Sequence, residues 1–456
     1  MKVDVIVIGS GQAGVPLAAR LAGSGRDVII VEANHLGGSC VNVGCTPTKT
    51  MVASARAAHV ARGAARLGVR TGEVKVDLAA VVDRKDAIVQ QFRNGVRRRL
   101  ERAGERLKLI EGRARFVGER EIEVNGERHA AETVIVNVGA RPRRPPVRGL
   151  DRVDWLSSSS IMELRQRPDH LVIMGGGYIA CEFGQMFRRF GSQVTIMQKG
   201  EHLLAREDTE ISQAIEEAFR SEGIEVVLNA EVVEVERRGG EVAVRCAGGQ
   251  ETQGSHLLVA VGRIPNTDEL GCATAGIELD DQGFIKVDDS YRSSAAGVYA
   301  VGDCNGGPQF THTSWDDHRI LYDILMGRRE GGRDGRIVPS TVFTDPQAAR
   351  AGLSEREAKA LGIECEVATM PFGYIARAIE MDETVGVMKV LIDPKTERIL
   401  GAALVGHEAG ELLHSFLMLM QAGVSARAMV DAQMVHPALA EGLQALVMKL
   451  ERFALR

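Results

Sequence analysis

Two segments of the chain share one order of hydrophobic and polar positions: an apolar run, a glycine-rich turn, an amphipathic stretch and a second apolar run. The first segment reads "VDVIVIG", "SGQAG", "VPLAARLAGSG" and "DVIIVEA", which predicts strand, turn, helix and strand. Its turn holds Gly9, Gly11 and Gly14 as GxGxxG, and Glu32 ends the second run. Such glycines let a pyrophosphate approach the helix N-terminus, and the acid accepts hydrogen bonds from a ribose. We therefore expect a dinucleotide site here.

The second segment is "HLVIMGGGYIACEFGQMFRRFGSQVTIMQKG". It has Gly175 and Gly177 in the first two motif positions, and Ala180 in the third, where the motif allows alanine. Two such segments predict two bound dinucleotides and two Rossmann-like domains, one interrupted by the other.

The expected fold class is α/β: two Rossmann-like dinucleotide-binding domains followed by a C-terminal α+β domain. Pro- and Arg-rich crossings in "VIVNVGARPRRPPVRGL" and "LLVAVGRIPNT" separate the segments. We expect one domain over 1–145 and 269–336, a second over 146–268 and a third over 337–456. A strand in "AAGVYAVGDC" delivers Asp303 at its C-terminal end, where open α/β sheets bind ligands.

Composition narrows the class of function. A net charge of -5 and an aromatic content of 4% argue against a nucleic-acid surface and favour small-molecule chemistry. The first apolar run begins at Val3, which leaves no room for a signal peptide, and no apolar segment reaches the length of a membrane helix. We expect a cytoplasmic protein, in a reducing compartment where a structural disulfide is disfavoured.

The segment "GGSCVNVGCTPTKT" brings together Cys40 and Cys45, two of seven cysteines. The pair is open to interpretation as a metal clip, a structural disulfide, a chance neighbourhood or a working dithiol. Zinc favours CxxC spacing with two further ligands, whereas the other cysteines are scattered singly, so we expect no metal. The following Ala-rich stretch predicts a helix, whose N-terminus lowers a thiol pKa and raises the reactive fraction.

Taken in order, "GSGQAG" with Glu32, "GGSCVNVGCTPTKT", "GGGYIACE", "VGRIPN", "YAVGD" and "HPALAE" resemble the FAD-dependent pyridine nucleotide–disulfide oxidoreductases. This family includes dihydrolipoamide dehydrogenase, glutathione reductase and mercuric reductase, and the resemblance spans essentially the whole chain. It implies FAD in the first Rossmann unit, NADH or NADPH in the second, and a dimerisation domain at the end of the chain.

The resemblance also implies a path for electrons, from NAD(P)H through FAD to a Cys40–Cys45 disulfide and on to a disulfide or related oxidant. Cys45 would lie against the flavin as the charge-transfer thiol, and Cys40 would attack the substrate. Lys49 would sit near the flavin and pair with Glu182.

Further positions match the family's cofactor contacts. Asp303 would bind the ribityl chain of FAD, and Thr311 would lie near the flavin pyrimidine at a helix N-terminus. Tyr178 would gate the nicotinamide pocket, with an ordinary core tyrosine as the alternative. Arg263, in "VGRIPN", is also expected to contact a cofactor.

Exchange between thiols and disulfides needs a group that moves protons. In "VHPALAEGLQAL", His436 precedes Pro437, expected at the first helical position, and Glu441, expected in the first turn. The resemblance matches a His–Glu pair of the family, in which the histidine reaches the dithiol of the other subunit. An active homodimer is therefore implied.

The coenzyme is predicted from the end of the second Rossmann unit, "VTIMQKG". Gln198 stands where an NADH-preferring enzyme usually has an acid for the ribose 2′-hydroxyl. Lys199, with His202 and Arg206 nearby, suits a 2′-phosphate. We therefore favour NADPH over NADH.

The electron acceptor stays open at this stage. Dihydrolipoamide dehydrogenase shares the His–Glu pair, but "CTPTKT" and "GGPQFTHTSWDDHRI" are more similar to a mercuric-reductase-like and oxidant-defence branch. The final "ERFALR" lacks the vicinal cysteines of mercuric reductase, which disfavours mercuric ion. An NAD(P)H oxidase, a transhydrogenase or a non-catalytic flavoprotein are further alternatives, disfavoured because none needs both the cysteine pair and His436.

Overall fold

The computed structural model describes residues 2–454 and divides into two compact units, which are described separately here. Unit 1 comprises the described residues up to Thr50, together with Val82–Arg143 and Gly262–Arg336. Unit 2 comprises Met51–Val81, Arg144–Val261 and the described residues from Ile337 onward.

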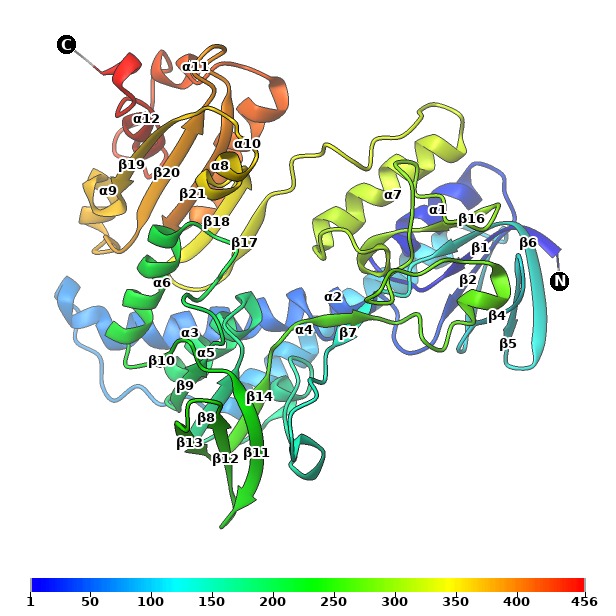
Figure 1. Cartoon of the computed structure of the whole chain (residues 1–456), viewed down its shortest axis with the longest axis horizontal. Coiled ribbons are helices and arrows are strands. Elements are labelled where there is room, and N and C mark those ends of the chain that lie inside the picture. Colours follow the sequence, from blue (N-terminus) through cyan, green and yellow to red (C-terminus); the bar gives the residue numbers. More distant parts are fainter. Residues whose placement is uncertain (1, 455–456) are drawn as a thin grey trace. The chain divides into compact units, whose positions relative to one another are not determined.

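A seven-stranded sheet forms the centre of unit 1 (Figure 1). Its order is β3-β2-β1-β6-β5-β4, and β16 also pairs with β6. Strands β1, β2, β3, β6 and β16 pair in parallel, while β5 pairs with β6 and β4 with β5, both antiparallel. The strands are β1 (Lys2–Ile8), β2 (Val28–Glu32), β3 (Leu107–Glu111), β4 (Arg115–Gly118), β5 (Glu121–Val124), β6 (Glu127–Val136) and β16 (Val298–Ala300).

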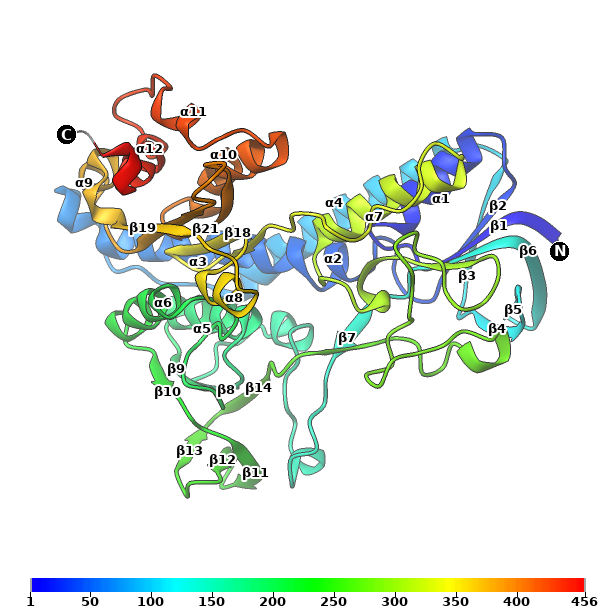
Figure 2. The same ribbon diagram turned by 45° about the horizontal axis from the view of Figure 1, so that its top comes forward.

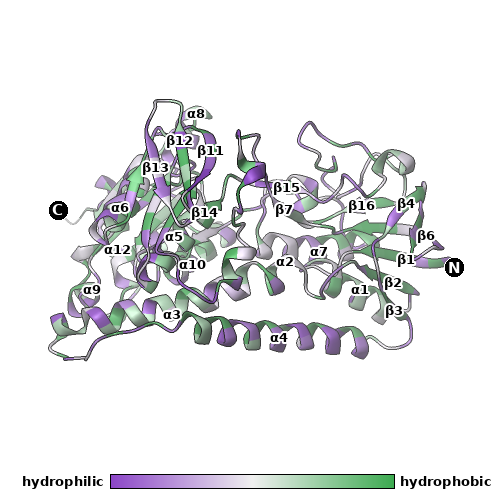
Figure 3. Ribbon diagram, turned by 90° about the horizontal axis from the view of Figure 1, so that it is seen from below, coloured by the Kyte–Doolittle hydropathy of each residue, from purple (hydrophilic) through white to green (hydrophobic). Residues whose placement is uncertain are grey.

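The central strands of unit 1 are buried on both faces. In β1 the run from Val5 to Ile8 is buried without alternation, which is typical of a parallel strand covered on both sides. Figure 3 shows these strands in the green of hydrophobic residues, whereas α4 is mixed green and purple, as expected for a helix with one solvated face. The helices of the unit include α1 (Gly14–Gly23), α2 (Gly38–Asn42), α7 (Thr311–Leu325), the first turn of α3 (Cys45–Gly63) and most of α4 (Leu78–Arg102).

The two Pro- and Arg-rich crossings pair with each other in unit 1. Strands β7 (Ala140–Pro142) and β15 (Arg263–Pro265) form a two-stranded antiparallel ribbon. Short 3₁₀ turns follow, η4 (Cys272–Ala275) and η5 (Gly302–Asn305), and the second of these carries Asp303 just after β16.

Unit 2 contains a second parallel sheet, of four strands in the order β10-β9-β8-β14. A three-stranded antiparallel sheet, β11-β12-β13, is inserted in the chain between β10 and β14 of this sheet. The elements are β8 (His170–Met174), α5 (Tyr178–Phe190), β9 (Gln193–Met197), α6 (Thr209–Ser221), β10 (Glu225–Val227), β11 (Val232–Arg238), β12 (Glu241–Cys246), β13 (Glu251–Gly254) and β14 (His256–Val259).

The C-terminal part of unit 2 is built on a five-stranded antiparallel sheet in the order β17-β18-β21-β20-β19. Helices α10 and α12 pack on one face of this sheet and α6 on the other (Figure 2). The elements are β17 (Ser340–Val342), β18 (Gln347–Gly352), α8 (Glu355–Ala360), β19 (Glu366–Pro371), α9 (Ala376–Glu380), β20 (Val387–Ile392), β21 (Ile399–Gly406), α10 (Ala409–Ala422), α11 (Arg427–Val430) and α12 (Glu441–Val447). The predicted fold class, with two Rossmann-like segments and a final α+β region, is confirmed.

Candidate active site

The first glycine turn joins β1 to α1, and its glycines are required by close backbone packing. Gly9 has a φ of +105°, and a Cβ there would lie 2.3 Å from the carbonyl oxygen of Asn137. A Cβ on Gly14 would lie 2.1 Å from the carbonyl oxygen of Gly9. A side chain at either position would displace main chain, so the turn keeps bare backbone at the N-terminus of α1, as a pyrophosphate requires.

Asn137 is a structural residue of this site that the sequence analysis missed. Its side chain is buried, and it accepts a hydrogen bond from the Gly14 amide at 2.9 Å and donates one to the Val301 carbonyl at 2.9 Å. Asn137 therefore ties the glycine turn to the end of β16, just before Asp303.

Glu32 lies at the end of β2, beside the glycine turn. One carboxylate oxygen accepts hydrogen bonds from the amide and the hydroxyl of Ser10, at 3.0 and 2.6 Å, and the other accepts one from the Asn34 amide at 2.8 Å. These bonds fix an acceptor where a ribose hydroxyl would donate, and the oxygen bonded to Asn34 has a further lone pair. The residues present fit the adenosine end of a dinucleotide.

Asp303 lies in η5, directly after the last parallel strand. Burial raises the pKa of Asp303, and the Arg263 guanidinium, 3.6 Å away, partly offsets that effect. Both side chains are mostly buried. A buried carboxylate at this edge of the sheet suits a ligand with hydroxyl donors, such as a ribityl chain.

The two cysteines lie on consecutive helices. Cys40 belongs to α2, and Cys45 is the first residue of α3. Both are reduced thiols in the structure, and the Cys45 sulfur lies 3.2 Å from the hydroxyl oxygen of Thr311, the first residue of α7. The dithiol and the N-termini of two helices thus meet in unit 1, where both helix dipoles favour negative charge.

The expectation that helix placement lowers the thiol pKa is wrong for Cys40. A hydrogen bond with Cys45 and, after it, burial raise the pKa of Cys40 well above its ordinary value. Cys40 lies within the short helix α2 and only Cys45 begins a helix, so the raised pKa keeps Cys40 protonated near neutral pH. Attack by Cys40 on a substrate therefore needs a base.

Two further residues that the sequence analysis missed hold α2 in place. The Asn42 amide donates to the carbonyls of Leu36 and Gly38, at 3.0 and 2.9 Å. Its oxygen accepts two hydrogen bonds from the Arg93 guanidinium of α4, at 2.7 and 3.0 Å. The helix that carries Cys40 is therefore pinned at its C-terminal end.

The second glycine turn lies in unit 2, between β8 and α5. Gly175 has a φ of +111°, and a Cβ there would lie 2.5 Å from the carbonyl oxygen of Ala260. A Cβ on Gly177 would meet no atom within 4 Å, which leaves open space at the N-terminus of α5. Tyr178 begins α5 and is exposed, whereas Ala180 is fully buried. This turn also fits a dinucleotide pyrophosphate.

The residues expected to select the coenzyme follow β9. The Gln198 amide donates to the His202 carbonyl at 3.2 Å. Lys199 forms an ion pair with Glu231 at 2.6 Å, and both side chains are exposed. A 2′-phosphate would therefore have to compete with Glu231 for Lys199.

Glu182, Lys49 and His436 are the other residues predicted to take part in the chemistry. Glu182 is buried on α5 and accepts a hydrogen bond from the Phe343 amide at 2.9 Å. Lys49 belongs to unit 1 and Glu182 to unit 2, so their pairing stays a prediction. His436 is 71% exposed and its Nδ1 lies 2.9 Å from a carboxylate oxygen of Glu441.

The predicted start of the last long helical segment is partly wrong. Helix α12 begins at Glu441, which confirms an acid in its first turn, but Pro437 lies four residues earlier, outside the helix. The His–Glu contact is therefore made between a loop and a helix N-terminus, where the carboxylate is also favoured by the helix dipole.

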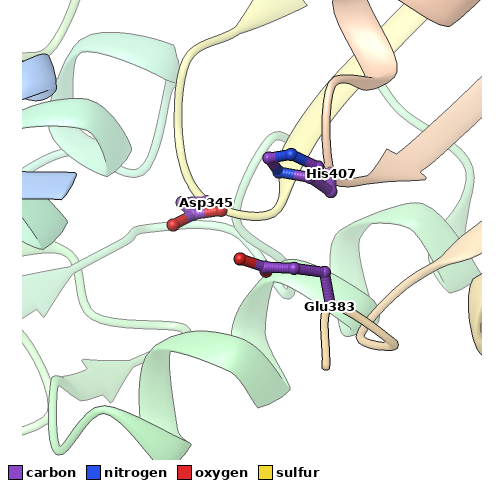
Figure 4. Close-up of side chains that lie close together, drawn as sticks. All are labelled: Asp345, Glu383 and His407. Atoms are coloured by element: carbon purple, nitrogen blue, oxygen red, sulfur yellow. The ribbon is translucent and has the colours of Figure 1, made fainter. Parts of the chain in front are cut away.

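A cluster in unit 2 resembles a metal site by residue type. Asp345 follows β17, Glu383 follows α9 and His407 follows β21, and their ligand atoms lie within 4.8 Å of one another (Figure 4). Arg56 donates to all three: to Glu383 at 3.0 Å, to His407 at 3.2 Å, and to Asp345. Although burial opposes it, Arg189 and Arg56 hold the pKa of Asp345 below its usual value. A metal cation would have to displace the Arg56 guanidinium, so we interpret the cluster as a group of polar and ionic contacts centred on Arg56.

Two glycine turns, an acid beside the first of them and a dithiol between helix N-termini define a dinucleotide-dependent dithiol enzyme. Residues 3–317 match the model of the pyridine nucleotide-disulphide oxidoreductases, and residues 338–447 match the dimerisation domain of the same family. The chain belongs to this family. It is an oxidoreductase that contains FAD, takes electrons from NAD(P)H and carries a dimerisation domain.

Relatives cover nearly the whole chain. A mercuric reductase of Lysinibacillus sphaericus is 34% identical over 98% of this chain and 83% of its own length. The probable pyridine nucleotide-disulfide oxidoreductase RclA of Escherichia coli is 35% identical over 98% of both chains. The structure of RclA, described as an HOCl-induced flavoprotein disulfide reductase, has a TM-score of 0.89, covers 97% of this chain and 99% of its own, and is 34% identical. No helix among residues 2–454 has both the length and the apolar character needed to cross a membrane.

Proposed function

We propose that the chain is an NADPH-dependent reductase of a small disulfide or related oxidant, and that Cys40 and Cys45 are its redox pair. The observation that carries the proposal is the placement of two adjacent thiols against Thr311, at the N-terminus of α7. FAD supplies the transfer of two electrons from NADPH to the cysteine pair. Glycine turns in each unit, Glu32 and Asp303 are the groups that would hold the two dinucleotides.

The exchange with a disulfide substrate balances within this pair. The Cys40 thiolate attacks one substrate sulfur, breaks the substrate S–S bond and releases the first thiol, which takes a proton. The Cys45 thiolate then attacks the Cys40 sulfur, forms the Cys40–Cys45 disulfide and releases the second thiol. Two electrons leave the protein and two protons are consumed.

His436 is the base that we assign to Cys40. Because the pKa of Cys40 is raised, the proton must be removed for attack, and imidazole paired with Glu441 is suited to accept it near neutral pH. In His436→Ala, exchange with the substrate should slow by about 10²–10⁴-fold, whereas reduction of bound FAD by NADPH should keep its rate. Equal rates of exchange in the variant and the wild type would refute this role.

The surface beside the dithiol suits an anionic acceptor. Trp315 lies one turn beyond Thr311 on α7 and is 40% exposed, and the Arg99 guanidinium lies 5.5 Å from the centre of its ring. An arginine held on an exposed aromatic ring offers charge and stacking to an acidic or aromatic disulfide.

An acceptor screen tests this class directly. NADPH oxidation would be followed with an anionic aromatic disulfide, its neutral analogue, glutathione disulfide, lipoamide, hypothiocyanite, mercuric ion and Cu(II), since RclA has also been crystallised with Cu(II). The anionic disulfide should have the higher kcat/KM, and Arg99→Gln should reduce that preference while Arg98→Gln, on the same helix, should not. A preference for lipoamide would instead assign the chain to the dihydrolipoamide dehydrogenases, and one for mercuric ion to the mercuric reductases.

The preference for NADPH rests on Gln198 in place of an acid. If Lys199 binds the 2′-phosphate, Lys199→Glu should lower kcat/KM for NADPH and leave that for NADH nearly unchanged. Glu231→Gln is the matched variant, because it frees Lys199 and should raise kcat/KM for NADPH. A wild-type enzyme that uses NADH more efficiently than NADPH would overturn the preference.

A further inference from the structure

Asp317 is a buried carboxylate on α7 that the proposed chemistry does not use. It is 1% exposed and accepts three hydrogen bonds: from the Tyr291 hydroxyl at 2.8 Å, the Gly302 amide at 2.8 Å and the Arg336 guanidinium at 2.9 Å. Burial of a carboxylate is costly unless each oxygen is satisfied, and here both are. Packing of α7 alone would be served as well by an apolar residue.

The three donors come from three separate segments of unit 1. Tyr291 precedes β16, Gly302 follows it, and Arg336 lies in the loop after α7. Burial, followed by the charge of Asp317, raises the pKa of Tyr291, so its hydroxyl stays protonated and remains a donor. Arg336 is 16% exposed and also pairs with Asp316 at 3.0 Å.

The bond to Gly302 fixes the residue directly before Asp303. Gly302 has a φ of +73°, and a Cβ there would lie 2.7 Å from Asn137 Nδ2 and 2.9 Å from Ser314 Oγ. The turn is therefore tightly enclosed. Among the side chains of the described residues, Asp317 alone accepts a hydrogen bond from the Gly302 amide. Asp317 thus determines how the main chain enters Asp303.

Helix α7 connects Asp317 and its hydrogen-bond donors to the dithiol. Thr311, at the N-terminus of α7, contacts Cys45, and Asp317 lies less than two turns further along the same helix. The hydrogen bond from Gly302 to Asp317 therefore sets the distance between the carboxylate of Asp303 and the helix N-terminus beside Cys45.

We propose that Asp317 is a positioning residue of the flavin site, which holds the Gly302–Asp303 turn in fixed register with the N-terminus of α7. It touches neither the substrate nor the reacting sulfurs and acts through Asp303 and Thr311. Cysteine chemistry needs no such residue, so this inference can fail while the proposed function stands.

FAD binding to the apoprotein tests the proposal, measured by quenching of flavin fluorescence. Asp317→Asn keeps the size of the side chain but cannot accept from Gly302, Tyr291 and Arg336 together, and should weaken FAD binding by about tenfold, because the negative charge and at least one of the three hydrogen bonds are lost. Asp316→Asn is the matched control: it removes the neighbouring charge and the other partner of Arg336, and should change FAD affinity less than twofold. Equal effects of the two substitutions would overturn the proposal.

A second measurement separates positioning from general stability. In protein reduced by two electrons, the long-wavelength absorbance per bound FAD reports the contact between Cys45 and the flavin, and it should fall in Asp317→Asn but not in Asp316→Asn. A role in stability alone would lower the melting temperature and leave this absorbance unchanged. If Asp317→Asn does not fold, Tyr291→Phe removes a single bond to Asp317; FAD binding should then weaken about threefold, and unchanged affinity would count against the proposal.

Discussion

Cys40 and Cys45 are five positions apart in the chain, yet they lie in different environments. Cys45 begins α3 and meets Thr311, whereas Cys40 lies on α2 and hydrogen-bonds to Cys45. The residue that would form a disulfide with Cys40 therefore also keeps Cys40 protonated. Protonated Cys40 is a poor nucleophile, so attack on a substrate requires a base that removes its proton.

This asymmetry predicts the pH dependence of Cys40 alkylation. The largest cause of its raised pKa is Cys45, so Cys45→Ser should lower the pH at which Cys40 becomes half-alkylated, because serine carries no negative charge near neutral pH. Iodoacetamide labelling of the reduced protein, followed by peptide mass spectrometry, measures the pH midpoint for Cys40. Cys365→Ser is the control and should leave the midpoint unchanged; a midpoint that rises in Cys45→Ser would contradict the assignment.

The residues that the sequence analysis missed have a common physical cause. Asn137 bonds to Gly14 across 123 positions of the chain, and Asp317 bonds to Tyr291 across 26. Hydrogen bonds between distant positions leave no local spacing, whereas the glycines of a βαβ turn act within one loop and are readable as a motif. The motif residues could thus be predicted, but the polar groups that hold the motifs together could not.

At the scale of elements, the five-residue helix α2 depends on a neighbour. A helix this short is not stable by itself, so its position relies on Asn42 and on Arg93 of α4. The predicted Ala-rich helix after the cysteines formed as expected, but α2 was not predicted because "GGSCVN" has neither the length nor the periodicity of a helix.

Arg93→Gln should loosen α2 without unfolding unit 1. The loss of a charged donor to Asn42 should destabilise α2 locally by about 1–2 kcal/mol, which should speed exchange of the Val43 amide, which donates to the Ser39 carbonyl of α2 at 2.9 Å. Arg97→Gln is a matched change on the same helix, since Arg97 is exposed and only weakly paired with Glu111 at 3.5 Å. Hydrogen–deuterium exchange of the two variants gives the comparison; equal protection of α2 in both would show that Arg93 does not hold it.

A second element-scale feature joins α6, α8 and β20 in unit 2. Lys389 on β20 is 1% exposed and its ammonium lies 3.0 Å from Asp208 and in ion pairs with Glu210 and Glu355. Although burial opposes it, the three carboxylates raise the pKa of Lys389 above its ordinary value. Its contribution to stability is therefore complete below pH of about 10 and is lost as pH rises through the folded-state pKa.

Lys389→Met should destabilise unit 2 by about 3 kcal/mol, because it leaves buried Asp208 beside two further carboxylates with no cation between them. Urea unfolding followed by tryptophan fluorescence, and amide exchange in β20 and α8, measure the effect. Lys359→Met, an exposed change on α8, is the control and should shift the urea midpoint little. Because protonation of the carboxylates relieves their repulsion, the deficit of Lys389→Met should shrink below pH of about 4.

At the scale of the whole molecule, the two parallel sheets were predictable because their strands are read from local patterns. Continuous apolar runs predicted β1, β2 and β8, and the apolar part of each strand is buried. What those patterns do not encode is which subunit's dithiol His436 would serve. His436 is exposed and hydrogen-bonded to Glu441, so its ring is accessible to a second subunit.

A heterodimer distinguishes a histidine that acts in its own subunit from one that acts in the partner. Subunits carrying Cys40→Ser and His436→Ala, each with a different affinity tag, would be co-expressed and the doubly tagged dimer purified. If His436 serves the partner's dithiol, one of the two sites joins an intact Cys40 to an intact His436, and the heterodimer should show about half of wild-type turnover, as expected for a two-fold assembly. If His436 acts within its own subunit, neither site is complete and turnover should stay at the level of the two inactive homodimers. The two arrangements predict different activities from the same mutations, so the measurement assigns the histidine without depending on which acceptor the enzyme uses.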